Sequence, residues 1–291
     1  MTKRPILIAG PTASGKSSLA LTLAERNGGM VINADSMQVY RELRILTARP
    51  TPQEEARAPH ALYGHVPAHE AYSVGRWIED VRAALAQART RDLRAVVVGG
   101  TGLYFKALLD GLSAIPPIPQ DVRAHWRARA TALEPEALHA ALAERDPEMA
   151  SRLATADRQR VTRALEVLGA TGRSLAEWQR EPGVPVLQPE ETERLVILPD
   201  RSDLYARCDR RFDAMMAAGA EAEVEALWAL GLGPDLPVMR ALGVGPLGLM
   251  IAGGLKRDQA LERAKAETRQ YAKRQVTWIK RHMSAWIVAI A

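Results

Sequence analysis

The chain has 291 residues, of which 47% are hydrophobic and 25% are charged, and its formal net charge is +5. These values are ordinary for a globular protein with one large or two modest domains. The single cysteine, Cys208, excludes an intramolecular disulfide and a cysteine-based zinc finger, and it fits a reducing compartment. Because no apolar run reaches the length of a membrane span and the N-terminus does not read as a signal peptide, we expect a cytoplasmic protein without a membrane partner.

The most informative stretch lies near the N-terminus, between an apolar run at 6–9 and an amphipathic run at 19–24. It reads Gly10-Pro11-Thr12-Ala13-Ser14-Gly15-Lys16-Ser17, which has the spacing G-x-x-x-x-G-K-S of a phosphate-binding loop between a strand and a helix. In such a loop the backbone N–H groups and the helix N-terminus face one anion, and Lys16 adds a full positive charge. Ser17 is placed to hold a Mg²⁺ ion. The pattern predicts a site for a di- or triphosphate, ATP included, without saying which.

Two further apolar runs end in polar residues. The predicted strand at 30–33 leads into Asp35, which is a candidate Mg²⁺ ligand or general base, although a turn aspartate has the same pattern. The predicted strand at 93–98 leads into Gly99-Gly100-Thr101, where Thr101 is a candidate to hydrogen-bond a substrate, to orient Asp35 or to cap a helix. Many P-loop enzymes have a carboxylate at this position, and its absence argues against an ordinary nucleotide hydrolase.

The remaining segments suggest one α/β domain with an insertion. Proline-rich stretches flank a region of short helices without strand signal, and apolar strands resume after it. We predict a P-loop NTPase-like parallel sheet flanked by helices, formed by residues 1–114 and 190–291, and an all-helical insertion domain, residues 115–189. Outside the insertion we expect a loop at 51–71, whose three histidines fit no metal-ligand spacing, helices at 202–218, 221–230 and 257–282, a glycine-rich turn region at 243–254 and a last strand at 286–290.

Positive charge is concentrated near the C-terminus. Residues 256–281 contain nine basic and three acidic side chains, a net charge of +6, which leaves the rest of the chain close to neutral. A basic helix on a neutral body indicates a polyanionic partner, although a solvated helix face gives the same pattern.

Several motifs together resemble one family, the tRNA dimethylallyltransferases, also called tRNA isopentenyltransferases. The resemblance spans nearly the whole chain in the correct order. It is carried by Gly10–Ser17, Asp35-Ser36-Met37-Gln38-Val39-Tyr40-Arg41, Gly99-Gly100-Thr101-Gly102-Leu103-Tyr104, Gln159-Arg160-Val161-Thr162-Arg163-Ala164-Leu165-Glu166, and Thr268-Arg269-Gln270-Tyr271-Ala272-Lys273-Arg274-Gln275 followed by Thr277-Trp278.

The resemblance implies transfer of a five-carbon allylic group from dimethylallyl diphosphate to the exocyclic amine of the adenine beside the anticodon. The acceptors would be tRNAs that read codons beginning with U, recognised through the anticodon stem-loop. The phosphate loop would hold a diphosphate leaving group, with Lys16 and a Mg²⁺ ion on Ser17 neutralising its charge. Since an adenine amine is a poor nucleophile, a carboxylate would accept its proton.

The resemblance also implies roles for individual residues. Asp35 matches the catalytic base, and Thr101 matches the residue that hydrogen-bonds this base or the adenine. Arg211 matches an arginine that reaches the diphosphate, with Arg207 and Arg210 as alternatives. The implied tRNA contacts are Asp35, Ser36, Met37, Gln38, Thr101, Arg123, Gln159, Arg160, Val161, Thr162, Arg163, Lys273 and Arg274.

The chain departs from the family pattern at 241–246, where an aromatic and a basic residue are missing. We expect no C-terminal zinc finger of the kind that some eukaryotic relatives have, and therefore recognition limited to the anticodon arm. We expect a monomer. Two other classes stay open from the residues alone: a P-loop small-molecule or nucleoside kinase, and a noncatalytic RNA-binding module that uses the loop as a nucleotide switch. The kinase leaves the basic helix unexplained, and the binding module leaves Asp35 and Thr101 unexplained.

Overall fold

The computed structural model describes residues 3–289, which form two compact units. One unit comprises the chain up to Leu109 together with the chain from Val186 onward, and the other is Asp110–Pro185. Both boundaries lie a few residues before those expected from the sequence. The reason at the second boundary is local, because the backbone N–H groups of Val186 and Leu187 both donate to the Leu108 carbonyl, at 2.9 and 3.2 Å.

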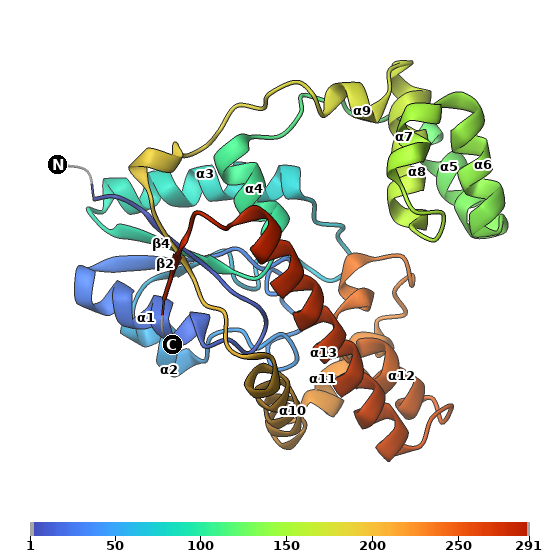
Figure 1. The fold of residues 1–291 in the computed structure, drawn as a ribbon. Helices are drawn as coiled ribbons and strands as arrows, with labels where there is room; N and C mark the ends of the chain where they lie inside the picture. The colour runs from blue at the N-terminus through green and yellow to red at the C-terminus, as the bar shows by residue number, and fades with distance from the viewer. Residues whose placement is uncertain (1–2, 290–291) are drawn as a thin grey trace. The chain divides into compact units, whose positions relative to one another are not determined.

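Within the described residues, a six-stranded sheet forms the centre of the first unit, in the order β3-β2-β4-β1-β5-β6 (Figure 1). Every neighbouring pair of strands is parallel. This arrangement confirms the parallel α/β fold that the sequence predicts. The strands are β1 Ile6–Ala9, β2 Gly29–Asn33, β3 His60–Ala61, β4 Arg94–Gly99, β5 Glu193–Val196 and β6 Ile287–Val288.

Helices flank this sheet and extend beyond it. None of the helices in residues 3–289 is long and apolar enough to cross a membrane. The helices of the α/β unit are α1 Lys16–Asn27, α2 Pro52–Arg57, α3 Val74–Thr90, α4 Gly102–Asp110, α10 Arg201–Ala217, α11 Ala220–Ala229, α12 Val244–Ile251 and α13 Arg257–His282, with short 3₁₀ turns η1 Pro189–Glu191 and η2 Pro237–Arg240.

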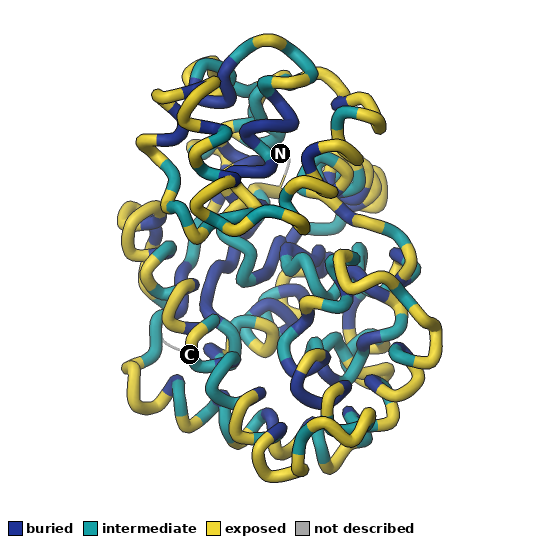
Figure 2. Tube along the Cα trace, turned by 90° about the vertical axis from the view of Figure 1, so that its right-hand side faces the viewer, coloured by how far each residue is buried: buried dark blue, intermediate teal, exposed yellow. Residues whose placement is uncertain are grey.

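The two faces of the sheet contribute to different hydrophobic clusters, because successive residues of a strand point to opposite sides. Ile6 and Ile8 of β1 pack with Ala20 of α1. Leu7, between them, belongs to a larger cluster that includes Trp77 of α3 and extends to α4 and α13. The central strands are therefore buried on both faces, and this explains their unbroken apolar sequences. Figure 2 shows the buried residues of the chain in dark blue.

Two expectations for local structure are wrong. The segment 51–71 contains α2, whose N-cap Thr51 forms a capping box with Glu54, and the two-residue strand β3. The glycine-rich stretch 243–254 contains α12 rather than a broken turn. Gly248 of this helix lies so close to Trp228 that a methyl group there would overlap the indole ring. Tertiary packing thus overrides the low helix propensity of glycine.

The second unit is entirely helical and has its own core. Its helices are α5 Gln120–Ala132, α6 Pro135–Arg145, α7 Pro147–Arg152, α8 Arg158–Thr171 and α9 Leu175–Trp178. Leu138, Leu142, Val161 and Leu165 are fully buried in one hydrophobic cluster together with Trp126.

Candidate active site

Three loops leave the same edge of the sheet from neighbouring strands. β1 leads into Gly10, β4 into Gly100 and β2 into Asp35, and the strands lie in the order β2-β4-β1. Since the strands are parallel, their carboxyl ends share one edge, and open α/β sheets bind ligands there, where the strand order reverses. The fold therefore gathers the phosphate-binding loop, Asp35 and Thr101 in one region.

The phosphate-binding loop, residues 10–17, has the backbone geometry that its sequence predicts. Gly15, which precedes α1, has a φ of 93°, and Ala13 has a φ of 62°. A Cβ at Gly10 would lie 2.6 Å from Oγ of Ser14. The Ser14 side chain is fully buried, and its hydroxyl forms no hydrogen bond within the described chain. Such a hydroxyl beside a helix N-terminus is available to an oxyanion.

Lys16 is the first residue of α1, and its ammonium lies against the loop. Its Nζ donates to the Pro11 carbonyl at 3.2 Å. Burial lowers the pKa of Lys16 to about 8, the nearby Asp35 carboxylate opposes this shift, and the positive charge of Arg211 adds to it. A phosphate group near Nζ would favour the charged form and raise the pKa again.

Arg211 of α10 approaches the same loop from another helix. Its guanidinium donates to the hydroxyl of Thr12, and burial lowers its pKa. Of the three arginines that the sequence left open, Arg211 is thus the one in contact with the loop. Neither Lys16 nor Arg211 forms an ion pair with another side chain in residues 3–289, so two partly desolvated cations face this region without a carboxylate salt bridge. This arrangement suits an anionic ligand.

Asp35 is held by the side chain of Asn33, a fully buried residue at the end of β2. Oδ1 of Asn33 accepts the Asp35 N–H at 2.8 Å, and its Nδ2 donates to the carbonyls of Asp35 and Leu62 at 2.9 and 3.0 Å. One oxygen of the Asp35 carboxylate accepts the N–H of Met37 at 2.9 Å. Asp35 is thus a turn aspartate, as one interpretation of the sequence predicts. The turn orients its carboxylate and is compatible with a chemical role.

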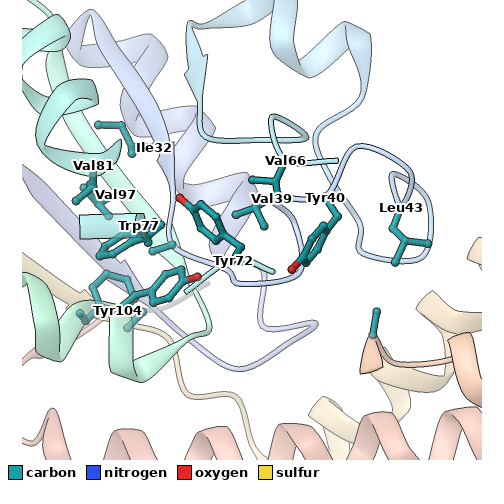
Figure 3. Close-up of a cluster of buried hydrophobic side chains, with 14 of the residues drawn as sticks. Ile32, Val39, Tyr40, Leu43, Val66, Tyr72, Trp77, Val81, Val97 and Tyr104 are labelled. Carbon is teal, nitrogen blue, oxygen red and sulfur yellow. The ribbon is translucent and has the colours of Figure 1, made fainter. Parts of the chain in front are cut away.

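The backbone of Asn33 is itself anchored from α3. Trp77 is completely buried, and its indole N–H donates to the Asn33 carbonyl at 2.9 Å. Trp77 stacks on Tyr104 of α4, with ring centroids 4.3 Å apart (Figure 3). The support of Asp35 therefore continues into the aromatic part of the core, which limits the freedom of the carboxylate.

Thr101 lies next to the segment that carries Asp35. Its Oγ1 accepts the N–H of Ser36 at 3.0 Å, and its own N–H donates to the Ala34 carbonyl at 3.3 Å. A methyl group at Gly99 would overlap Ala34, so the glycine permits this close approach of the two loops. Thr101 is therefore joined to the Asp35 segment through the backbone of Ser36.

A cavity of about 260 Å³ opens beside these groups. Its polar wall includes the phosphate-binding loop through Thr12, the Asp35 carboxylate and the Arg211 guanidinium. Its apolar wall includes Phe212 of α10 and Leu46. The remaining lining residues are Ser36, Met37, Thr47, Cys208, Met215, Arg240, Ala241, Leu242, Thr268, Tyr271 and Arg274. A cavity with cations, a carboxylate and an apolar surface fits a ligand that has both an anionic and a hydrocarbon part.

Glu223 of α11 shapes the apolar wall, a role for which its sequence context carries no signal. Its carboxylate accepts the backbone N–H groups of Ile45 and Leu46, each at 2.8 Å. Leu46 and Phe212 in turn contact Gly243, whose φ is 89° and where a Cβ would lie 3.0 and 3.2 Å from them. The position of Leu46 thus depends on an acidic side chain distant in the sequence.

The positive charges of α13 are distributed unevenly. In its first half, Arg257, Arg263, Lys265 and Arg269 each pair with an acidic side chain. In its second half, Lys273, Arg274, Lys280 and Arg281 form no ion pair within the described chain. The second half also borders an open groove of about 440 Å³, where Trp278 stacks on His282 with ring centroids 4.4 Å apart. Cations without acidic partners beside a half-buried tryptophan and an exposed histidine suit a nucleic acid.

The residues expected to contact tRNA lie in different environments. Ser36, Met37, Thr101 and Arg274 lie at or beside the cavity, whereas the Gln38 amide donates to the carbonyls of Thr47 and Ala48, both at 2.9 Å. In the helical unit, Arg123, Gln159 and Arg160 are exposed and Arg163 is half-buried. Val161 and Thr162 are buried, Val161 in that unit's core, so a contact of these two positions with RNA stays a prediction.

The fold and the site define a P-loop protein of the α/β class that has a carboxylate beside its phosphate-binding loop. Two family models match the sequence, "IPP transferase" over residues 38–282 and "Isopentenyl transferase" over residues 4–60. The chain belongs to the tRNA dimethylallyltransferase family, also called the tRNA isopentenyltransferases.

Individual relatives agree with this assignment. A tRNA dimethylallyltransferase from Nitrobacter hamburgensis is 56% identical over 278 residues, which cover 96% of this chain and 88% of the relative. One from Methylobacterium nodulans is 56% identical over 282 residues, which cover 96% of this chain and 92% of the relative.

Two solved structures are similar across the chain. The tRNA isopentenylpyrophosphate transferase of Bacillus halodurans superposes with a TM-score of 0.69 at 30% identity and covers 99% of this chain and 90% of its own. A eukaryotic dimethylallyltransferase, described as acting on tRNA, superposes with a TM-score of 0.81 at 31% identity and covers 95% of this chain and 70% of its own.

Proposed function

We propose that this protein transfers the dimethylallyl group of dimethylallyl diphosphate to the exocyclic amine of the adenine 3′-adjacent to the anticodon, in tRNAs that read codons beginning with U. The observation that carries the proposal is the cavity lined by the Arg211 guanidinium, the Asp35 carboxylate and an apolar wall, beside a phosphate-binding loop that carries Lys16. The relatives act on the same type of substrate according to their names. A P-loop kinase would have the same loop, but family membership supports the transferase over it.

The diphosphate is the leaving group of this reaction. The backbone N–H groups of the loop, Lys16 and Arg211 would surround the diphosphate, whose charge increases as the allylic C–O bond breaks. The bond electrons leave with the diphosphate, and preorganised cations stabilise this charge better than water does, because they need not reorient. The apolar wall around Phe212 fits the five-carbon group.

Asp35 is proposed to accept the proton of the adenine amine. As the amine nitrogen forms its bond to the allylic carbon, one N–H proton must leave, and a carboxylate within hydrogen-bond reach is a suitable base. Asn33 and the Met37 N–H fix the carboxylate, and Thr101 fixes the neighbouring Ser36. These contacts keep the base oriented before the substrates arrive.

A Mg²⁺ ion is a further proposal. Within residues 3–289 no group of three or more acidic, histidine or cysteine side chains is arranged to hold a metal, but the Ser17 hydroxyl lies exposed in the first turn of α1. One hydroxyl fits this ion, because Mg²⁺ on phosphates usually keeps several waters and takes its other ligands from the substrate. The ion would supply charge neutralisation to the diphosphate.

The proposed partner is the anticodon stem-loop, whose target adenine must be drawn out of its stack. Lys273 and Arg274 would contact its phosphates, and the exposed Arg123, Gln159 and Arg160 of the helical unit would add contacts. We propose that the protein acts as a monomer in the cytoplasm, where tRNA is available.

Mass spectrometry tests the proposal directly. An anticodon stem-loop RNA is incubated with the protein, Mg²⁺ and dimethylallyl diphosphate, and then digested. We expect one dimethylallyl group on the adenine beside the anticodon and none on a stem-loop with guanine there. A sample that leaves the RNA unmodified and consumes ATP instead would support the kinase.

A further inference from the structure

We propose that Gln275 of α13 is a positioning residue that fixes the diphosphate-binding loop against the turn after β4. The proposal deepens the function above and rests on it for the identity of the diphosphate. Gln275 is not among the residues to which the sequence motifs assign a role, although it lies in the motif 268–275.

The geometry is that of a two-sided clamp. The Gln275 side chain is buried, with 6% of its surface exposed. Its Oε1 accepts the backbone N–H of Thr12 at 2.8 Å, and its Nε2 donates to the Gly100 carbonyl at 2.9 Å. One amide therefore connects two loops that leave the neighbouring strands β1 and β4, and it uses both its donor and its acceptor to do so.

Gly100 is shaped to receive this amide. A methyl group at Gly100 would overlap Nε2 of Gln275, so a residue with a side chain would displace the clamp. Gly100 immediately precedes Thr101, whose Oγ1 accepts the Ser36 N–H. Through Gly100 the same glutamine thus steadies the turn that connects to the Asp35 segment.

On the loop side, the clamp completes the fixation of Thr12. The Thr12 hydroxyl receives a hydrogen bond from Arg211 of α10 while its N–H is held by α13. Because the Thr12 N–H points to Gln275, it is not free for a phosphate oxygen, and the anion is left to the other N–H groups of the loop. A loop ordered in this way needs less reorganisation when the diphosphate binds.

Two substitutions break the clamp from opposite sides. Gln275→Met removes both hydrogen bonds with little change in size, and Gly100→Ala displaces an intact glutamine. We expect each to weaken the binding of inorganic pyrophosphate about tenfold, measured by titration calorimetry with Mg²⁺. The KM for dimethylallyl diphosphate should rise by the same factor, and the affinity for an anticodon stem-loop should stay within twofold. Gln87→Met is the matched control, since Gln87 is exposed near the end of α3 that leads to the start of β4.

The double variant distinguishes positioning from general damage. If both changes break one clamp, the double variant binds pyrophosphate no more weakly than the poorer single variant, whereas independent damage adds up. Additive losses overturn the proposal. The proposal is also overturned if either variant binds pyrophosphate as tightly as the wild type does. Thermal unfolding measures the folded fraction of each variant, and the affinity is calculated for that fraction. Because pyrophosphate binding needs no RNA, the clamp is tested even if the wild-type protein fails to modify RNA, which would refute the proposed function alone.

Discussion

The α/β unit and the helical unit hold their candidate ligand residues in different ways. In the α/β unit, Asp35 and Thr12 are fixed by the buried amides of Asn33 and Gln275, which form three and two hydrogen bonds between 2.8 and 3.0 Å. In the helical unit, Arg160 is 75% exposed, and its one ion pair within residues 3–289 is with Asp157, its own helix N-cap, at 3.0 Å.

This difference separates residues that must be placed accurately from residues that contribute mainly their charge. Groups that take part in bond formation must be held within a fraction of an ångström, which buried, fully satisfied amides can provide. Cations that meet RNA phosphates can adapt, since their attraction is long-ranged and exposed ion pairs contribute little to stability. We expect substitutions of the buried, hydrogen-bonded residues to alter catalysis. Substitutions of the exposed cations should alter RNA affinity and its salt dependence.

The largest effect is expected at Asp35. Asp35→Asn keeps an oxygen for the Met37 N–H but removes the proton acceptor, so kcat should fall at least about a hundredfold. RNA affinity, measured by filter binding, should change less than twofold. A kcat within tenfold of the wild type would exclude Asp35 as the base.

The next effect concerns the support of this carboxylate. Asn33→Ala leaves the Asp35 N–H and the Leu62 carbonyl without their partner, and should lower the free energy of unfolding by about 2 to 4 kcal/mol. Because Asp35 is no longer held, kcat should also fall about tenfold.

Urea unfolding and steady-state kinetics measure the two effects of Asn33→Ala. Asn27→Ala is the control, since in the part of the chain that the structure describes the exposed Asn27 amide bonds only to Leu23 of its own helix. Stability lost with an unchanged kcat would show that Asn33 serves the fold and not the base.

A moderate effect is expected from pH. Lys16 has a pKa lowered to about 8 in the free protein, so it loses its proton as the pH rises through that value. The KM for dimethylallyl diphosphate should therefore rise above pH 8, by up to tenfold per unit. Lys16→Arg keeps its charge at these pH values and should flatten the profile, even if its KM is higher throughout. A wild-type KM constant from pH 7 to 9.5 would contradict the assignment.

The smallest effect is expected on the RNA side. Replacing Lys273 and Arg274 by alanine should reduce the slope of log affinity against log salt by about 0.7 to 0.9 for each phosphate that is no longer neutralised. Arg263→Ala with Lys265→Ala is a matched control on the same helix, because both cations already pair with acidic side chains. Equal slopes in the two double variants would assign Lys273 and Arg274 to an ordinary solvated face.

The sequence predicts those elements of the fold that are determined by neighbouring residues. The phosphate-binding loop, the central strands and the bounds of the helix at 257–282 follow from glycine spacing and apolar periodicity, which need no distant partner. The helix α12 escapes such prediction because its stability comes from Trp228 packing on Gly248, which no glycine count reveals.

The supporting residues of the site could not be found this way. Glu223 caps the backbone at 45–46, and Gln275 bonds to Thr12, a residue 263 positions earlier. Such roles depend on which loops the fold brings together. Asn33 had a weak signal, because a polar residue at the end of a buried strand needs hydrogen-bond partners. The choice of Arg211 over Arg207 and Arg210 likewise depends on the rotation of α10 about its axis.

Thr12 and Gln275 are 263 positions apart in the sequence, and this separation determines when the clamp can form during biosynthesis. The first loop is translated early, but its N–H finds its acceptor only after α13 has left the ribosome and folded. Contacts so distant in sequence close slowly, because chain entropy must be lost before they form. A nascent chain that lacks α13 therefore has the complete phosphate-binding sequence without the clamp that orders it, and we expect it to bind a diphosphate less tightly than the chain in which α13 has folded.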